Sequence, residues 1–364
     1  MIQTTDCSTA TEPNHKDFEA PRERIPSTPP VINTVPKNIS RPLWSVMIPV
    51  YNCINYLRET LECVLKQDAG PEQMQIAVID DCSTDGDIEA LVREIAGDRI
   101  EYYRQSENQG SLRNFETCLN RSVGHLVHLL HGDDQIMPGF YAEINQLFNK
   151  FPEAGAAFTN IAHVQSDGKL MYLHKKLSAD TCILDDFLVQ NAKQLLVQPP
   201  AIVVKRSVYE QLGGFYAVHY GEDREMWTRI SAHFPIAYSP RYFAKYRYYT
   251  ENSITKQSIL TGRNIYDVIK IIDIMQSYLP AEKRVEVKRE SRLEYALYCV
   301  ALAGSLYRTN RSAAIIQAKG ALLMSNDIRV YKELAKFLLR GFGRYEKIKT
   351  ALVRLRRTFL LSHE

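Results

Sequence analysis

Two adjacent carboxylates in the first half of the chain could hold a divalent metal ion. Asp133 and Asp134 follow His131-Gly132 and the apolar run at 126–130, which is typical of a buried strand. Mg²⁺ and Mn²⁺ prefer oxygen ligands, and ligands of open α/β sheets bind at the carboxyl ends of the strands. A metal ion there could neutralise a departing diphosphate. Asp-Asp pairs are also common in turns, so this interpretation depends on the rest of the chain.

Two further acidic pairs occupy comparable positions. Asp80 and Asp81 end the short apolar run 76–79, and Glu222 and Asp223 stand at the start of an expected helix near 222–233. A carboxylate can accept a hydrogen bond from a uracil or thymine imide or from ribose hydroxyls, and it can take a proton from a reacting hydroxyl. The structural alternatives are a helix cap for the first pair and a dipole-stabilised acidic helical turn for the second.

Alternating strand and helix patterns would bring these carboxylates together. Apolar runs at 44–50, 76–79, 100–103 and 126–130 predict strands, and apolar residues at helical spacing lie between and after them. This order is typical of an α/β fold with a mostly parallel sheet and helices on both faces. Because the ends of parallel strands lie at one edge of the sheet, we expect their loops to converge.

Composition divides the chain into three parts. Residues 1–41 are rich in Pro, Thr, Asn and charge, and we expect a disordered tail because they cannot bury enough apolar surface. Residues 42–255 carry the strand and helix pattern. Residues 256–364 are almost wholly helical and end in a basic amphipathic stretch. Such a helix can lie on an anionic membrane or pack its apolar stripe on the protein, and both alternatives stay open.

Overall composition excludes several classes of protein. The net charge is only +3 and no basic stretch is interleaved with aromatic residues, so we expect no nucleic-acid partner. No apolar run approaches a membrane span, and the first ten residues lack the features of a secretory signal. The seven cysteines lack CxxC spacing, which favours a reduced, cytoplasmic protein. Peripheral contact with the inner face of the cell membrane is a further hypothesis.

The order of short motifs along residues 44–250 resembles the family-2 glycosyltransferases with the GT-A fold. The motifs are Pro-Val-Tyr-Asn at 49–52, Asp-Asp-x-Ser-Thr-Asp-Gly at 80–86, Asn-x-Gly-x-x-Arg-Asn at 108–114, Asp-Asp-x-x-x-Pro-Gly at 133–139, Gly-Gly-Phe at 213–215 and Glu-Asp at 222–223. None is decisive alone, whereas six in this order are highly specific. The resemblance implies an inverting enzyme that transfers sugar from a nucleotide diphosphate donor to a hydroxyl of a glycan or glycolipid acceptor. A UDP- or dTDP-sugar is favoured and a GDP-sugar remains an alternative.

The resemblance also implies roles for individual residues. Asp223 would be the catalytic base, and Asp133, with Asp134 beside it, would bind Mg²⁺ or Mn²⁺. The residues that would bind the nucleotide or substrate are Pro49, Tyr51, Asp80, Asp81, Gly110, Arg113, Asn114, Glu222 and Arg247. Arg113 and Arg247 would pair with diphosphate oxygens.

Two departures from the family pattern favour a rival hypothesis. His131 stands where the first Asp of the family's Asp-x-Asp motif is usual, and Tyr249 stands where a late His is usual. A catalytically degenerate protein that binds a sugar nucleotide or docks an assembly complex would tolerate both. A nucleotidyltransferase is disfavoured, because residues 51–55 lack a Gly-rich loop with Arg or Lys.

Overall fold

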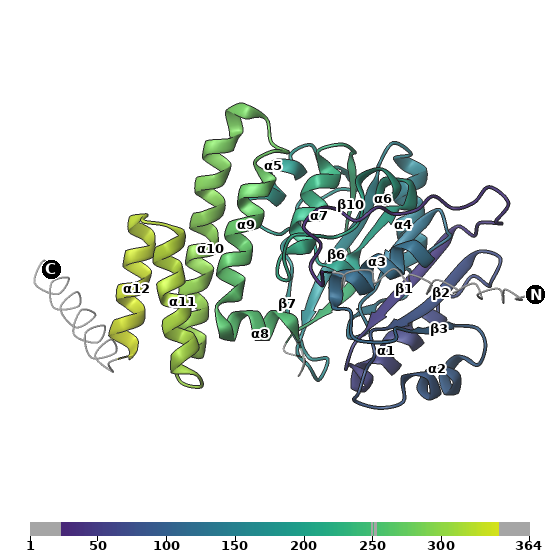
Figure 1. Ribbon diagram of the computed structural model, residues 1–364. Coiled ribbons are helices and arrows are strands. Elements are labelled where there is room, and N and C mark those ends of the chain that lie inside the picture. Colours follow the sequence, from purple (N-terminus) through teal and green to yellow (C-terminus); the bar gives the residue numbers. More distant parts are fainter. Residues whose placement is uncertain (1–22, 249, 251–252, 342–364) are drawn as a thin grey trace, which may run out of the picture.

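The computed structural model describes residues 23–248, 250 and 253–341, which form an α/β part followed by a helical region (Figure 1). In the described residues one mixed sheet runs in the order β3-β2-β1-β4-β9-β6-β10-β5, with β7 paired to β6 and β8 paired to β10. The strands are β1 Trp44–Val50, β2 Met74–Asp80, β3 Glu101–Arg104, β4 Leu126–Leu129, β5 Gln135–Ile136, β6 Ala156–Val164, β7 Leu170–Leu173, β8 Cys182–Ile183, β9 Ile202–Lys205 and β10 Ile236–Arg247.

The helices alternate with the first strands and then continue alone. They are α1 Ile54–Leu65, α2 Ile88–Ala96, α3 Ser111–Arg121, α4 Phe140–Lys150, α5 Phe187–Lys193, α6 Arg206–Leu212, α7 Glu222–Ser231, α8 Ile254–Thr261, α9 Arg263–Met275, α10 Arg284–Leu306, α11 Arg311–Met324 and α12 Ile328–Gly341, with short 3₁₀ turns at Pro199–Ala201 and Ala281–Lys283.

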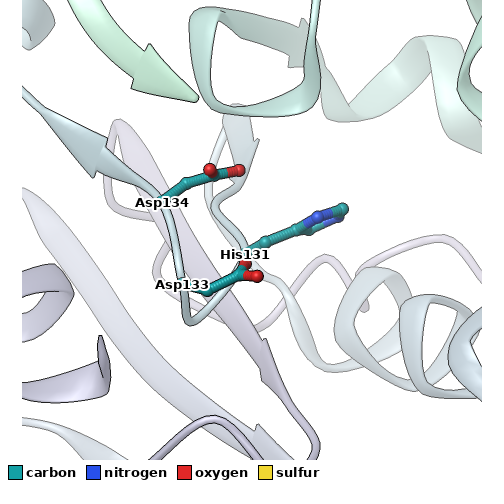
Figure 2. A group of neighbouring side chains, drawn as sticks. All are labelled: His131, Asp133 and Asp134. Carbon is teal, nitrogen blue, oxygen red and sulfur yellow. The ribbon is translucent and has the colours of Figure 1, made fainter. Parts of the chain in front are cut away.

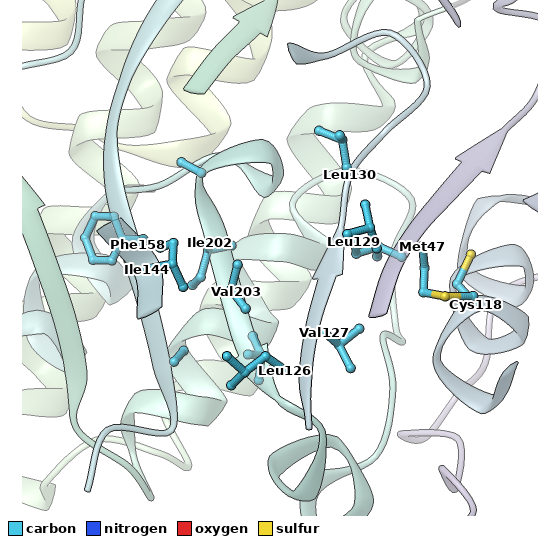
Figure 3. Packing of buried hydrophobic residues seen from close by; sticks show 14 of the residues in the cluster. Met47, Cys118, Leu126, Val127, Leu129, Leu130, Ile144, Phe158, Ile202 and Val203 are labelled. Carbon is cyan, nitrogen blue, oxygen red and sulfur yellow. The ribbon is translucent and has the colours of Figure 1, made fainter. Parts of the chain in front are cut away.

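The expected parallel core of the sheet is confirmed. Strands β3, β2, β1 and β4 are mutually parallel, and β9 joins this half antiparallel to both β4 and β6. All seven residues of β1 are buried, so both faces of the central sheet are covered, as its continuous apolar run indicates. Figure 3 shows the packing beside β1 and β4, where Met47 lies near Cys118 and residues of β9 face those of β4.

Residues 23–41, which were expected to belong to a disordered tail, are packed against the rest of the protein. Residues 23–41 pack along the α/β part, and Ile32 is buried with an exposed fraction of 2%. The carbonyls of Pro26 and Pro30 accept hydrogen bonds from Ala217 N–H at 2.9 Å and Gly214 N–H at 2.8 Å. Proline lacks a backbone donor but keeps its carbonyl, so a Pro-rich segment can be held through acceptors alone. Residues 1–22 lie outside the described residues.

The helical region forms its own core and shares it with the α/β part. Apolar residues of α9, α10 and α11 pack with Ala217 and Val218, which precede α7. Among the described helices, none combines the length and the apolar character that crossing a bilayer requires. The six described cysteines are free. The basic amphipathic end of the chain, from residue 342 onward, lies outside the described residues.

Candidate active site

The ends of β1, β2 and β4 open into a cleft of about 1250 Å³ that also reaches α7 and the helical region. The sheet therefore brings together most of the residues that the sequence singled out. Those that line the cleft are Pro49, Tyr51, Asp81, Gly110, Asn114, Asp133, Glu222, Asp223 and Arg247. Asp80, Arg113 and Asp134 do not line it.

The turn between β4 and β5 presents the candidate metal ligands. Figure 2 shows His131, Asp133 and Asp134 projecting from this turn. One potential ligand atom from each lies within 4.8 Å of the others. The buried hydroxyl of Thr60 on α1 holds the turn, because it donates to the carbonyls of Gly132 at 3.1 Å and Asp134 at 2.7 Å. Asp133 Oδ2 accepts from the Thr250 hydroxyl at 3.1 Å.

Asp134 is buried behind this turn rather than open to the cleft. Its Oδ1 accepts the Arg247 N–H at 2.9 Å, and its Oδ2 has no hydrogen-bond partner among the described residues. Burial and the neighbouring Asp133 charge raise the pKa of Asp134 well above its usual range. A buried oxygen without a partner is costly, so this atom needs either a proton or a cation.

The Arg247 side chain makes hydrogen bonds within the protein and positions the turn between β4 and β5. Its Nε donates to the Asp133 carbonyl at 2.9 Å, its Nη1 to the Ser166 carbonyl at 2.7 Å, and its Nη2 pairs with Glu59 at 2.6 Å. The guanidinium also lies 4.9 Å from the centre of the Tyr56 ring. Arg247 lines the cleft, but each of its three guanidinium nitrogens donates to a protein partner, so the diphosphate contact expected from the sequence stays a prediction.

Asp81 and Gly110 join the end of β2 to the start of α3. Asp81 Oδ2 accepts from Gly110 N–H at 2.9 Å and from the Asn108 amide at 2.8 Å, while Oδ1 accepts Gln109 N–H at 2.7 Å. Gly110 has φ +92°, a backbone conformation that side chains disfavour. Burial raises the pKa of Asp81. Asn114 of α3 adds a further contact with β2, because its side-chain amide donates to the Ile79 carbonyl at 2.9 Å.

The structure separates the two residues of the first acidic pair. Asp80 is buried and accepts from Ser83 N–H at 2.9 Å, from the Tyr102 hydroxyl at 2.8 Å and from Arg104. Its carboxylate therefore braces the sheet edge and does not face the cleft, contrary to the expected nucleotide contact. The helix-cap alternative is also wrong for both residues, because Asp87 caps α2.

Arg113 also lies away from the position that a diphosphate ligand would require. Its Nη1 pairs with Glu116 at 2.7 Å, and its Nε donates to the Glu23 carbonyl at 2.7 Å. The expected diphosphate role is thus replaced by a structural one. Glu116 lies one helical turn after Arg113, as the alternative of an ion pair at the helix start predicts, whereas Glu23 belongs to the segment before β1, which no local pattern around 113 indicates.

Glu222 and Asp223 form the first turn of α7 at the other side of the cleft. Burial raises the pKa of Asp223 to about 6, against the opposing influence of its hydrogen bond from Arg224 N–H and the Arg224 charge. Burial and the Asp223 charge raise the pKa of Glu222 well above its usual range. Ionisation of Asp223 therefore disfavours ionisation of Glu222 in the same turn.

The helical region holds Asp223 in place. Gly221 precedes it with φ +89°, and a Cβ there would lie 2.8 Å from Ile271 Cδ1 of α9. Asp267 of α9 accepts the N–H groups of His219 and Tyr220, each at 3.2 Å. Arg224 donates to the Ser291 hydroxyl of α10 at 2.6 Å. The catalytic candidate thus depends on helices beyond the expected α/β boundary.

Several residues of the cleft were not identified from the sequence. Tyr295 and Tyr298 of α10 line it near Tyr220, with ring centres 6.4 Å apart for Tyr220 and Tyr295. Arg24 lines it from the segment that was expected to be a tail. Asn108 belongs to the recognised Asn-x-Gly motif, whereas no sequence signal marks the others. Tyr249, the second departure from the family pattern, lies outside the described residues.

Comparison with known proteins shows what the chain is similar to. Residues 45–213 match the profile of Glycosyl transferase family 2. An uncharacterised protein of Mycobacterium tuberculosis is 27% identical over 254 residues, which is 66% of this chain and 77% of that protein. An uncharacterised glycosyltransferase of Rickettsia felis is 26% identical over 228 residues, 61% of this chain but only 37% of that longer protein.

Solved structures share the fold at low sequence identity. TarS of S. aureus, residues 1–349 in complex with UDP-GlcNAc, superposes with a TM-score of 0.56 at 12% identity, covering 85% of this chain and 91% of that one. The mannosyltransferase PcManGT of Pyrobaculum calidifontis, in complex with GDP-Man and Mn²⁺, superposes with a TM-score of 0.52 at 16% identity, covering 86% and 90%. The match over residues 45–213 makes this chain similar to the enzymes of glycosyl transferase family 2, and its mixed sheet with a helical region has the GT-A fold of the solved glycosyltransferases.

Proposed function

We propose that this protein transfers a sugar, with inversion at the anomeric carbon, from a nucleotide diphosphate-sugar to a hydroxyl of a glycan or glycolipid acceptor. The observation that carries the proposal is the shared cleft. Asp133 lines it from the turn between β4 and β5, and Asp223 lines it from α7. Tyr51 and Asp81 line the same cleft. A donor that spans from Tyr51 and Asp81 to Asp133 would present its anomeric carbon toward Asp223.

The donor is proposed from chemistry and from the relatives. TarS and PcManGT were solved with UDP-GlcNAc and with GDP-Man, respectively, which supports a nucleotide sugar as the ligand class. The exposed Tyr51 ring can stack on a base. Asp81 can accept from an imide N–H in addition to its present partners, because each carboxylate oxygen offers two lone pairs. We favour UDP or dTDP over GDP.

The residues of the β4–β5 turn fit a divalent cation. Asp133 offers carboxylate oxygen at the cleft, and the unpartnered Asp134 Oδ2 lies behind it. Burial lowers the pKa of His131, and its neutral ring, which stacks on Phe115 with 5.1 Å between the ring centres, would offer one nitrogen lone pair to a metal ion. Asp133 would hold Mg²⁺ or Mn²⁺ with Asp134 in support. The bound ion would supply positive charge against the departing diphosphate.

Asp223 is the proposed general base. Its carboxylate would take the proton of the acceptor hydroxyl while that oxygen bonds to the anomeric carbon and the carbon–oxygen bond to the diphosphate breaks. Glu222, protonated in the same turn, would remain a hydrogen-bond donor to the acceptor or the sugar. Arg224 stabilises the ionised form of Asp223 through its backbone N–H at 2.7 Å and its charge.

The acceptor would enter between α7 and the helical region. Tyr220, Tyr295 and Tyr298 line this side of the cleft, and aromatic faces with hydroxyl groups are suited to sugars. A glycan or lipid-linked acceptor fits this surface. We propose a cytoplasmic enzyme that works at the inner face of the cell membrane, with contact through the basic end of the chain, and we propose no role for nucleic acid.

A nucleotide panel tests the proposed function. UDP, dTDP and GDP, each with and without Mn²⁺, should be compared by thermal unfolding, followed by transfer assays with the matching sugar nucleotides. We expect one nucleotide at 100 times its Kd to raise the melting temperature by about 3 to 4 °C, with a smaller shift when Mn²⁺ is absent. If none of the three nucleotides shifted the melting temperature of a folded sample, the proposal would fail.

The pH dependence of transfer follows from the raised pKa of Asp223. Because the base must be ionised, kcat/KM should be constant above pH 7 and fall about tenfold for each unit below the Asp223 pKa of about 6. The measurement is kcat/KM from pH 5 to 8 with saturating Mn²⁺. An acid limb near pH 4, where an ordinary carboxylate titrates, would contradict the assignment of Asp223.

A further inference from the structure

The segment formed by residues 23–33, here named the N-terminal strap, packs on α3 and on the loop before α7. The Glu23 carbonyl accepts from Arg113 Nε of α3, and the carbonyls of Pro26 and Pro30 accept from the N–H groups of Ala217 and Gly214. Burial of Ile32 fastens its far end. These contacts hold the strap at a defined place, so a side chain that it carries can be part of the site.

Arg24 is the strap residue that faces the cleft. Its Nη1 donates to the Asn108 carbonyl at 2.6 Å, and its Nη2 donates to Asn108 Oδ1. Its guanidinium lies against Gly110, where a Cβ would be 3.4 Å from Arg24 Nε. Arg24 thus covers the loop whose N–H groups hold Asp81. Its positive charge opposes the rise in the Asp81 pKa that burial causes.

The position of Arg24 relative to the sheet indicates which part of a donor it would meet. Asp81 follows β2 and Asp133 follows β4, with β1 between them. Two strand spacings separate these ends by about 10 Å. A donor with its diphosphate near Asp133 would therefore reach the Asp81 side with its nucleoside half, and Arg24 is attached to that side through Asn108 and Gly110.

We propose that Arg24 binds the nucleoside half of the donor and is the cationic nucleotide contact that Arg113 does not provide. This inference rests on the proposed function. A guanidinium can donate to a base carbonyl or a ribose hydroxyl and can stack on the base plane, and it can do so while it keeps the Asn108 contacts. The strap would thereby make donor affinity depend on a segment outside the α/β sheet.

Binding of separate donor fragments tests the proposal. Calorimetric titrations with UMP, UDP and inorganic pyrophosphate, all with Mn²⁺, should compare the full-length protein with Arg24→Ala. If dTDP or GDP gives the largest shift of the melting temperature in the nucleotide panel, dTMP and dTDP, or GMP and GDP, replace UMP and UDP. We expect about tenfold weaker binding of both nucleotides and unchanged binding of pyrophosphate, since one charge-assisted contact is lost at the nucleoside. Arg58→Ala is the matched control, because Arg58 is an exposed arginine that pairs with Glu94 and does not line the cleft.

The outcomes separate this proposal from its alternatives. Unchanged nucleotide affinity in Arg24→Ala, or an equal loss of pyrophosphate affinity, would overturn it. A merely structural role predicts a lower melting temperature in Arg24→Ala and an equal affinity loss in Ile32→Ala, which loosens the strap but keeps Arg24; we expect neither. Arg24→Lys should restore part of the affinity, because it keeps the charge without the planar fork. If the unaltered protein binds none of the nucleotides, the proposed function itself fails.

Discussion

Replacing Asp223 with Asn is expected to lower the kcat of sugar transfer by about 10²- to 10⁴-fold, the usual contribution of a general base. The amide keeps the size of the side chain and can still accept the Arg224 N–H, but it cannot take the acceptor proton. Donor affinity should stay within about twofold, because Asp223 lies across the cleft from Tyr51 and Asp81. Single-turnover transfer and calorimetric donor binding measure the two quantities separately.

Glu222→Gln is the matched control for this variant. Because burial and the Asp223 charge raise the pKa of Glu222 and so favour its neutral carboxyl, the neutral amide resembles the native side chain and transfer should fall much less than in Asp223→Asn. Asp223→Asn with transfer undiminished would remove Asp223 from the mechanism. An unaltered protein that binds the donor and transfers no sugar to any acceptor would support the rival hypothesis of a degenerate binding or docking protein.

Replacing Asp133 with Asn is the second change with a large expected effect. The amide removes a negative charge from the cleft side of the β4–β5 turn, where Asp133 is the proposed ligand of Mg²⁺ or Mn²⁺. We expect transfer at saturating donor to fall by about 10³-fold, which corresponds to the several kcal/mol of charge stabilisation that a metal ion supplies. Calorimetric titration should show that Asp133→Asn binds Mn²⁺ more weakly than the unaltered protein. It should also show that binding of the donor nucleotide to this variant no longer depends on Mn²⁺.

Asp98→Asn serves as the control for the loss of one carboxylate, because the Asp98 side chain is fully exposed outside the cleft. It should retain native Mn²⁺ affinity and transfer. Chelation with EDTA should reduce transfer by the unaltered protein to the level of Asp133→Asn and have little further effect on that variant. Mn²⁺-dependent donor binding that persists in Asp133→Asn would contradict the ligand assignment.

The sequence by itself determined the α/β part and much of the cleft. Continuous apolar runs such as 44–50 indicate a sheet covered on both faces, and their alternation with helices predicts the parallel arrangement of β3, β2, β1 and β4. Parallel strands end at one edge, so Tyr51, Asp81 and Asp133 had to lie near one another. The ordered motifs extended this set to Asp223, although it lies on a helix far along the chain.

Only the tertiary structure decided which members of this set face the cleft. Asp80 and Asp81 are neighbours, yet Asp80 turns to Tyr102 and Arg104 while Asp81 lines the cleft. Arg247 pairs with Glu59, Arg113 donates to the Glu23 carbonyl in addition to its neighbour Glu116, and Arg24 contacts Asn108, so each depends on a partner distant in sequence. The physical reason is that burial and hydrogen-bond partners are set by segments that meet in space, whereas periodicity reports only how a segment folds locally.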